Sequence, residues 1–290
     1  MSTTDFKALI SLLDDPDEEI YNQIKSKILG FGPDKISDLE EAWEHAHDKL
    51  TQSRLEEIIH QIQFENTNQS ILSWATQKNN DLFEGVCHII KYQFPDFNKE
   101  ALEEKIEQYK RDVWIELNEN LTALEKIKII NHILFDVHAF TGNTSNYHAS
   151  QNSYLNKVVE TKKGNPLSLS ILYAVVAQRL NLPVFGVNLP EHFILAWLDT
   201  HVPTENIEDY PVLLYINAFS KGTVFVRKEI DNFLAQLKIT PRPQFYKPCT
   251  NLDIIKRMLR NLINSYEKEG KAIKKEEIEV LLPDFETINS

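Results

Sequence analysis

The chain has 290 residues, of which 42% are hydrophobic and 10% aromatic, and this composition excludes a disordered protein. Its 43 acidic and 31 basic residues give a formal net charge of -12, which disfavours nucleic acid as a partner because an acidic surface repels phosphate backbones. The opening residues, "MSTTDFKALI", lack the pattern of a signal peptide, and no apolar run approaches the roughly 20 residues that span a bilayer. We therefore expect a cytoplasmic protein that does not act at a membrane, with its two cysteines as reduced thiols.

Residues 1–75 are expected to be helical. In "DDPDEEIYNQIKSKILGFG", Asp15 is predicted to cap a helix, Pro16 to take its first position and Glu18 to complete a capping box. Together with the apolar helices on either side, this turn resembles a HEAT-type repeat, and an ordinary helical bundle would give the same signals. Either arrangement presents an exposed face to a partner.

Apolar residues three and four apart predict further helices up to residue 140. The asparagine-rich stretch 143–165 predicts an ordered loop with a short helix over Tyr154–Glu160. Segments rich in β-branched and aromatic residues begin only after residue 183, as "VFGVNL", "HFILAWL", "VLLYINAF" and "TVFVR", with Gly222 as a hairpin turn. Helices return before a charged, partly mobile tail over 271–290. The order predicts an α+β fold that is mostly helical with a small antiparallel sheet.

The segment "KKGNPLSLS" predicts a well-defined helix start. Asn165 is a good N-cap, Pro166 is the favoured first helical residue, and Ser168 and Ser170 are small enough for close packing. A helix start also concentrates unpaired N–H groups and positive potential, so it can stabilise a nucleophile or an anion.

Two polar residues interrupt the apolar strands that follow. His192 opens the strand "HFILAWL", and Asn217 lies within "LYINAF". A lone histidine in such a strand is most often a core residue with satisfied hydrogen bonds. Buried polar groups in neighbouring strands usually meet, however, and an asparagine that orients a histidine is known from cysteine proteases. We therefore interpret His192 and Asn217 as a candidate general base and the residue that orients it.

From about residue 80 to 270 the chain resembles the transglutaminase-like superfamily, which has a papain-like core, and more narrowly its bacterial SirB-type branch. The segments that carry the resemblance are "DLFEGVCHI", "INHILFDVHAFTGN", "NYHASQNSYLNKVVETKKGNPLSLSILYAVVAQRLNLPVFGVNLPEHFILAW", "YINAFSKG" and "IKRMLRNLINSYEKEG". This resemblance implies a transglutaminase-like core at 80–270. The HEAT-like region at 1–75 lies outside the matched segments, and a charged tail is expected at 271–290.

The resemblance also implies what the site has lost. Catalytic members of the superfamily use a cysteine at a helix start in a Gly-x-Cys pattern, a histidine on one strand and an aspartate on the next. Gly164 and the two residues after it fit that start, with Pro166 in place of the cysteine. His192 matches the histidine and Asn217 stands where the aspartate is expected. The SirB-type branch generally has proline or a similar residue at the cysteine position.

We therefore expect a pseudoenzyme that binds a ligand or a protein and does not catalyse a reaction. The inherited cleft is expected to involve the remnant dyad, the position of the lost cysteine and four binding residues, namely Tyr154, Asn165, Ser168 and Ser170. Neither a cofactor nor a metal is expected, since His45 and His47 lie on different helix faces.

Two alternatives stay open. One is a hydrolase or acyltransferase that uses His192 as its base with an unconventional nucleophile, Ser170 or Cys249. The other is a helical adaptor that binds its partner through the N-terminal region.

Overall fold

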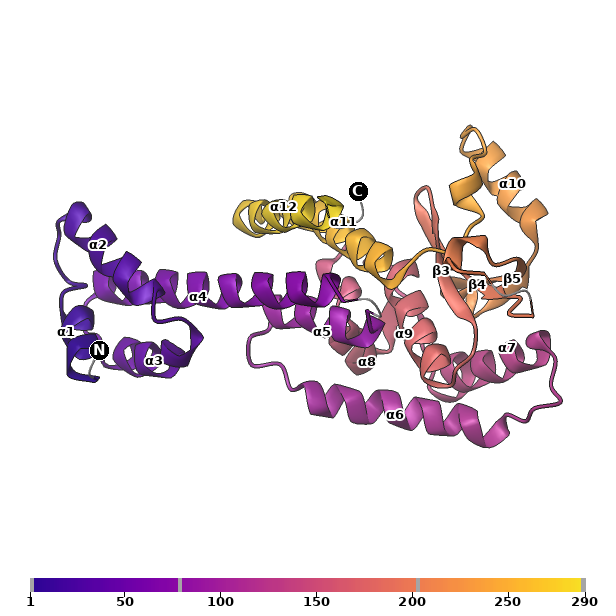
Figure 1. Ribbon diagram of the computed structural model, residues 1–290, viewed down its shortest axis with the longest axis horizontal. Coiled ribbons are helices and arrows are strands. Elements are labelled where there is room, and N and C mark those ends of the chain that lie inside the picture. Colours follow the sequence, from indigo (N-terminus) through magenta and orange to yellow (C-terminus); the bar gives the residue numbers. More distant parts are fainter. Residues whose placement is uncertain (1–2, 78–79, 202–203, 288–290) are drawn as a thin grey trace. The chain divides into compact units, whose positions relative to one another are not determined.

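The structure is a computed structural model that describes residues 3–77, 80–201 and 204–287 (Figure 1). The chain divides into two compact units, one formed by Met1–Ser73 with Lys91–Pro95 and the other by Trp74–Ile90 with Asp96–Ser290. Each unit is described by itself.

Helices dominate the first unit. They are α1 (Thr3–Ser11), α2 (Glu18–Leu29), α3 (Ile36–His45) and α4 (Lys49–Ala75), with the short 3-10 helix η1 (Pro33–Lys35) before α3. Their buried faces share one apolar core, formed by Phe6, Leu13, Tyr21, Ile24, Ile28, Leu39, Leu55, Ile58 and Ile62. The helical prediction holds, and HEAT-like packing stays a prediction.

The cap of α2 differs from the sequence prediction. Asp17 is the N-cap, and its Oδ1 accepts from the N–H of Glu19 at 2.8 Å. Asp15 lies two residues earlier, where its Oδ1 accepts from the Asp17 N–H at 2.9 Å and closes a local turn. The buried guanidinium of Arg54 secures this turn by donating to the Leu13 carbonyl at 3.0 Å.

The rest of the chain confirms the predicted class, an α+β fold with a helical majority. The helices that follow α4 are α5 (Leu82–Gln93), α6 (Lys99–Glu116), α7 (Ala123–Asn131), the π-helix η2 (His132–Val137), α8 (Leu155–Thr161), α9 (Pro166–Arg179), α10 (Arg227–Gln236), α11 (Asn251–Glu269) and α12 (Ala272–Thr287). Short 3-10 turns are η3 (Ser150–Ser153), η4 (Ile207–Asp209), η5 (Ala218–Ser220) and η6 (Pro243–Phe245). The expected partly mobile tail is instead the helix α12, which packs on α11 with Ile278 and Leu281 buried.

One antiparallel sheet has the order β3 (Val184–Leu189), β4 (His192–Leu198), β5 (Val212–Asn217) and β6 (Thr223–Phe225). All four strands lie where β-branched and aromatic residues predict them. A further parallel pair, β1 (Thr141–Gly142) with β2 (Lys163–Gly164), has no sequence signal because each strand is two residues long. This pair leads directly into α9.

Helix α9 is the central element of the second unit. Every residue from Pro166 to Ala177 is buried, because the helix packs on β3 and β4 and also contacts α6 and α8 (Figure 1). A helix buried on all sides has no polar face. The backbone N–H groups at the start of α9 therefore need hydrogen-bond partners from nearby residues.

The β5–β6 turn offers a test of the packing. Gly222 has φ +72°, and a Cβ there would lie 1.9 Å from Oδ1 of Asn131, whose amide donates to the Gly222 carbonyl at 2.7 Å. Gly270 has φ +70° with nothing within 4 Å. We expect Gly270→Ala to cost about 1 kcal/mol of unfolding free energy for the left-handed backbone alone. Gly222→Ala should cost about 1–2 kcal/mol more because Asn131 must move and lose its hydrogen bond. Urea denaturation measures both, and equal losses would contradict the packing.

Candidate functional site

The start of α9 is fixed by a reciprocal cap. Asn165 Oδ1 accepts from the Ser168 N–H at 2.8 Å, while Ser168 Oγ accepts from the Asn165 N–H at 3.0 Å. Asn165 Nδ2 also donates to Ser153 Oγ at 3.0 Å. Gly164 allows this geometry, since a Cβ on it would lie 2.7 Å from Ser168 Oγ. Pro166 follows at the first helical position, where its missing N–H costs no hydrogen bond.

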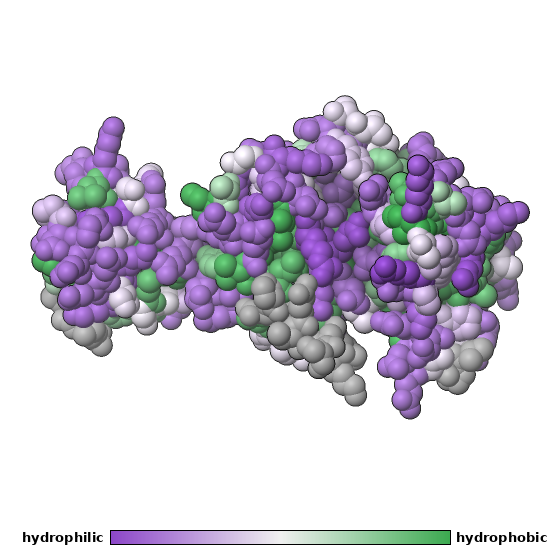
Figure 2. Space-filling view, turned by 90° about the horizontal axis from the view of Figure 1, so that it is seen from above, coloured by the Kyte–Doolittle hydropathy of each residue, from purple (hydrophilic) through white to green (hydrophobic). Residues whose placement is uncertain are grey.

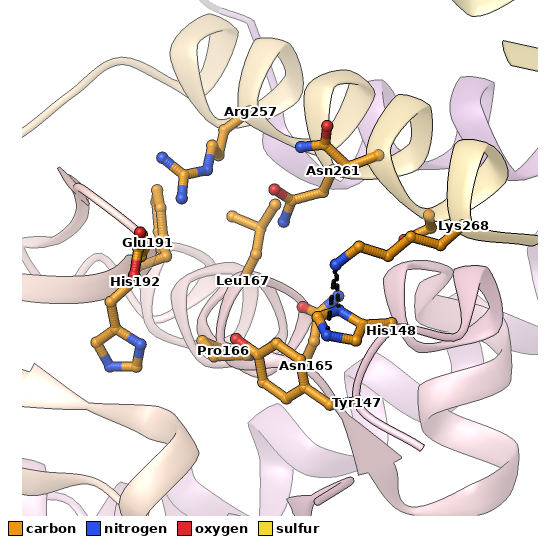
Figure 3. Close-up of a pocket in the computed structure, with 13 residues that line it drawn as sticks. Tyr147, His148, Asn165, Pro166, Leu167, Glu191, His192, Arg257, Asn261 and Lys268 are labelled. Carbon is orange, nitrogen blue, oxygen red and sulfur yellow. Dashed lines mark hydrogen bonds between the residues drawn. The ribbon is translucent and has the colours of Figure 1, made fainter.

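A pocket of about 200 Å³ opens at this helix start. Four segments of the second unit line it (Figure 3). They are Tyr147 and His148 before η3, Asn165–Leu167 at the start of α9, Glu191–Phe193 at the β3–β4 turn, and Arg257, Asn261, Asn264, Ser265 and Lys268 on α11. Most of these side chains are polar, and Pro166 and His192 line the same pocket.

The Asn217 side chain lies close enough to the His192 ring to influence its pKa. Asn217 also caps η5, because its Oδ1 accepts from the N–H groups of Phe219 at 3.1 Å and Ser220 at 3.3 Å. The His192 ring centroid lies 6.0 Å from that of Phe233 on α10. As the first residue of β4, His192 lies at the end of an interior strand, beside Phe233 of α10 and in the pocket lining, and the η5 cap fixes the Asn217 side chain next to it.

Burial lowers the pKa of His192 from its ordinary value of 6.5. The Asn217 side chain works in the opposite direction, and the positive charge of Arg257 adds to the lowering. The imidazole is therefore predominantly neutral at pH 7, as a general base would have to be. The same state suits a ring that only offers hydrogen bonds to a ligand.

The two cysteines lie outside the pocket lining. Cys87 and Cys249 are both buried, and burial raises the pKa of each thiol. The Cys249 N–H donates to the Gly186 carbonyl at 2.8 Å, which ties this residue to the edge of β3. A thiol becomes a nucleophile only as its thiolate, so neither environment favours attack.

The other sequence-predicted binding residues lie near the pocket to different degrees. Asn165 lines it, whereas Ser168 is buried in the cap. Ser170 is fully buried, and its hydroxyl has no hydrogen-bond partner in the described part of the chain. Tyr154 is buried as well, with its hydroxyl hydrogen-bonded to that of Tyr266. The structure thus brings Asn165, and not the other three, to the pocket surface.

The polar face of α11 was missed by the sequence analysis. Arg257, Asn261, Asn264 and Lys268 follow one another at spacings of four, three and four, which places them along one face of a helix. That spacing is a usable signal. It is also the ordinary pattern of a solvated helix face, and only the tertiary structure, in which α11 and the start of α9 line one pocket, distinguishes the two.

No helix in the described part of the chain is long and apolar enough to cross a membrane. No group of three or more His, Cys, Asp or Glu side chains in the described ranges is arranged to hold a metal ion.

Comparison with known proteins places this site in a wider context. Residues 100–260 match the family model described as the transglutaminase-like superfamily. The chain is 34% identical over 142 residues to F-box only protein 21 of Mus musculus. The aligned region covers 49% of this chain and 22% of that protein. It is 27% identical over 197 residues to a UPF0162 protein of Xylella fastidiosa (strain 9a5c), covering 63% and 64% of the two chains. No solved structure matches the chain significantly.

The link between the imidazole and the η5 cap can be tested at Asn217. Asn217→Asp keeps an oxygen for the two backbone N–H groups and adds a negative charge, so it should raise the pKa of His192. Asn217→Ala removes the amide that favours the charged ring and should lower that pKa further. An NMR titration of the ring protons follows both changes. Asn206→Asp, an exposed change of equal charge, is the control. An unchanged pKa in both Asn217 variants would mean that the side chains do not interact.

Proposed function

The chain belongs to the transglutaminase-like superfamily, and we propose that it is a non-catalytic member that binds a ligand or a protein segment in the pocket at the start of α9. In this proposal the chain keeps the fold of an acyl-transfer enzyme and has lost the catalytic reaction. The pocket, with the dyad of His192 and Asn217 behind it, serves recognition.

The observation that carries the proposal is the residue at the helix start. Pro166 lines the pocket at the position that the superfamily resemblance assigns to the cysteine nucleophile, and proline has no group that can attack. Proline at this position stabilises the helix, whereas a nucleophile there would serve catalysis. Both native thiols are buried with raised pKa values, which supports the same conclusion.

The hydroxyl groups near this helix start support it too. The Ser168 hydroxyl is buried and occupied in the cap, and Ser170 is fully buried one turn deeper in α9. Among the described residues, Asn217 is the uncharged side chain that influences the pKa of His192, and no serine or cysteine forms a hydrogen bond with this ring. A serine nucleophile would need both access to substrate and contact with its base.

The relatives support the proposal that the shared region binds a partner in proteins that also contain other regions. The matched region is 22% of the length of F-box only protein 21, so most of that protein lies outside the shared core. We further propose that this chain is of the SirB-type branch, acts in the cytoplasm, and has a HEAT-like N-terminal region that offers a second binding face. The mixed polar lining of the pocket supports binding of a polar group more than an adaptor role for the N-terminal region alone.

Affinity capture with the full chain as bait tests the binding role. Wild type is compared with His192→Ala, which alters the pocket, and with His201→Ala, the same substitution at an exposed position. We expect specific partners, quantified by mass spectrometry, to be retained by wild type and His201→Ala and depleted at least about fivefold by His192→Ala, because one lost polar contact costs about 1 kcal/mol or more. Equal recovery with all three baits would contradict a binding role for this pocket.

A designed thiol tests whether the inherited frame persists. In Pro166→Cys combined with Asn217→Asp, the new cysteine would lie at the start of α9, and unpaired N–H groups and a protonated His192 both favour thiolate. We expect its pKa to fall well below the ordinary value of about 8.5. The cost in stability should be modest, about 0.5–1 kcal/mol for the lost proline.

The pH dependence of alkylation at residue 166, resolved from the buried native thiols by peptide mass spectrometry, measures this pKa. Adding His192→Ala should return it upward. A midpoint near 8.5 in both backgrounds would mean that the site never had the geometry of a nucleophile and its base.

A further inference from the structure

The pocket differs in charge from the chain around it. The chain carries a formal net charge of -12, yet the pocket lining includes two permanent cations, Arg257 and Lys268, and one carboxylate, Glu191. With its histidines counted as neutral, the lining has a net charge of one positive unit. Figure 2 shows a molecular face on which hydrophilic residues predominate, so the polar character of the pocket is not distinctive by itself.

Arg257 is the cation placed deepest. Its guanidinium is half-buried, and burial together with the neighbouring Arg260 lowers its pKa, so its charge is held at a cost. One of its five N–H groups donates to the Leu189 carbonyl at 3.3 Å. Within the described residues it has no carboxylate partner. Buried cations are normally paired, so an unpaired guanidinium facing a pocket is suited to an incoming anion.

Neutral donors surround this cation. The amides of Asn261 and Asn264 line the pocket, and neither has a hydrogen-bond partner among the residues that the structure describes. In Figure 3 the Asn261 side chain extends from α11 toward the pocket, between Arg257 and Lys268. Lys268 Nζ lies 3.1 Å from Nδ1 of His148, which holds the ammonium at the rim.

Glu191 is held at the opposite rim by an unusual backbone. It has φ +58° in the two-residue turn between β3 and β4, a left-handed conformation that glycine adopts with less strain. Its carboxylate limits the net charge of the pocket to one positive unit. That charge matches a single carboxylate better than a dianionic phosphate group.

We propose that this pocket binds a carboxylate group of a peptide, with Arg257 as its main contact and the α11 amides as supporting donors. The inference rests on the proposed binding function and adds the chemistry of the ligand. The carboxylate comes from a peptide C-terminus or from an acidic side chain, since the planar guanidinium can donate two hydrogen bonds to either one. A volume of about 200 Å³ fits a group of this size rather than a whole cofactor.

Titration of the ¹⁵N-labelled full chain tests the inference by NMR. The probes are N-acetylglycine for a terminal carboxylate, N-acetylaspartic acid α-amide for a side-chain carboxylate, N-acetylglycinamide as the neutral match, and inorganic phosphate. We expect saturable shifts at the Leu167 amide and the Arg257 side chain with one or both carboxylates, and much weaker binding of the neutral probe. The tighter of the two carboxylates identifies the source.

Variants assign the contact. Arg257→Gln should raise the dissociation constant about tenfold or more through loss of charged hydrogen bonds. Glu191→Gln should lower it about two- to threefold by removing a like charge. Arg242→Gln removes an exposed arginine outside the pocket lining and should leave it unchanged.

The outcomes separate this inference from the proposed function. Equal binding of the neutral probe, or tighter binding of phosphate, would overturn the carboxylate inference and leave a binding pocket in place. Absence of any probe binding at this pocket would overturn it as well, while affinity capture still decides whether the pocket binds a partner. Equal recovery of partners with all three baits in that capture experiment would instead remove the proposed function on which the inference rests.

Discussion

The whole second unit depends on how α9 begins inside the protein. A helix start has several unpaired N–H groups, and at α9 the residues that carry them are buried apart from their contact with the pocket. Asn165 and Ser168 each accept a hydrogen bond from the other's backbone N–H. Gly164 has no Cβ that would clash with Ser168 Oγ, and Pro166 has no N–H that needs a partner. The residues that an active relative would use for a nucleophile and its surroundings are here engaged in starting a buried helix.

This constraint has a consequence for function. Once the cap occupies Asn165 and Ser168, the groups left to meet a ligand come mainly from elsewhere, above all from α11 and the β3–β4 turn. His192 then sits at the rim with a neutral ring, beside an asparagine that is itself fixed by the η5 turn. The arrangement is polar, and at the helix start itself Pro166 offers no nucleophile while the Ser168 hydroxyl is engaged in the cap.

Much of this could be predicted from the sequence, and the exceptions have physical reasons. The start of α9 and the four main strands carry strong local signals, so "GNPLS" and the β-branched segments are sufficient to locate them. The α2 cap was wrong by two residues because three aspartates stand close together and only the backbone path selects Asp17. The helix α12 was missed because its sequence is charged, and its apolar residues become meaningful only when α11 lies beside them.

The candidate site was predicted only in part. The sequence places Pro166 at a helix start and His192 and Asn217 on neighbouring strands, and in the structure Pro166 and His192 line one pocket with Asn217 beside His192. Tyr154 was expected at the cleft, yet its hydroxyl meets Tyr266 in the interior, and no local pattern distinguishes a buried tyrosine from one that lines a pocket. Arg257 and its neighbours on α11 come from about 90 residues beyond Pro166, so only the tertiary fold brings them to the helix start.

The central claim, that the inherited site binds and does not catalyse, is tested most directly by covalent trapping. The native full chain is incubated with a fluorophosphonate and separately with iodoacetamide, and adducts are located by peptide mass spectrometry in wild type and in His192→Ala. The account predicts no stoichiometric adduct on any serine or cysteine that depends on His192. A stoichiometric adduct on Ser170, Cys249 or any other residue of the second unit that disappears with His192→Ala would contradict it, because such a residue would be a nucleophile activated by this base.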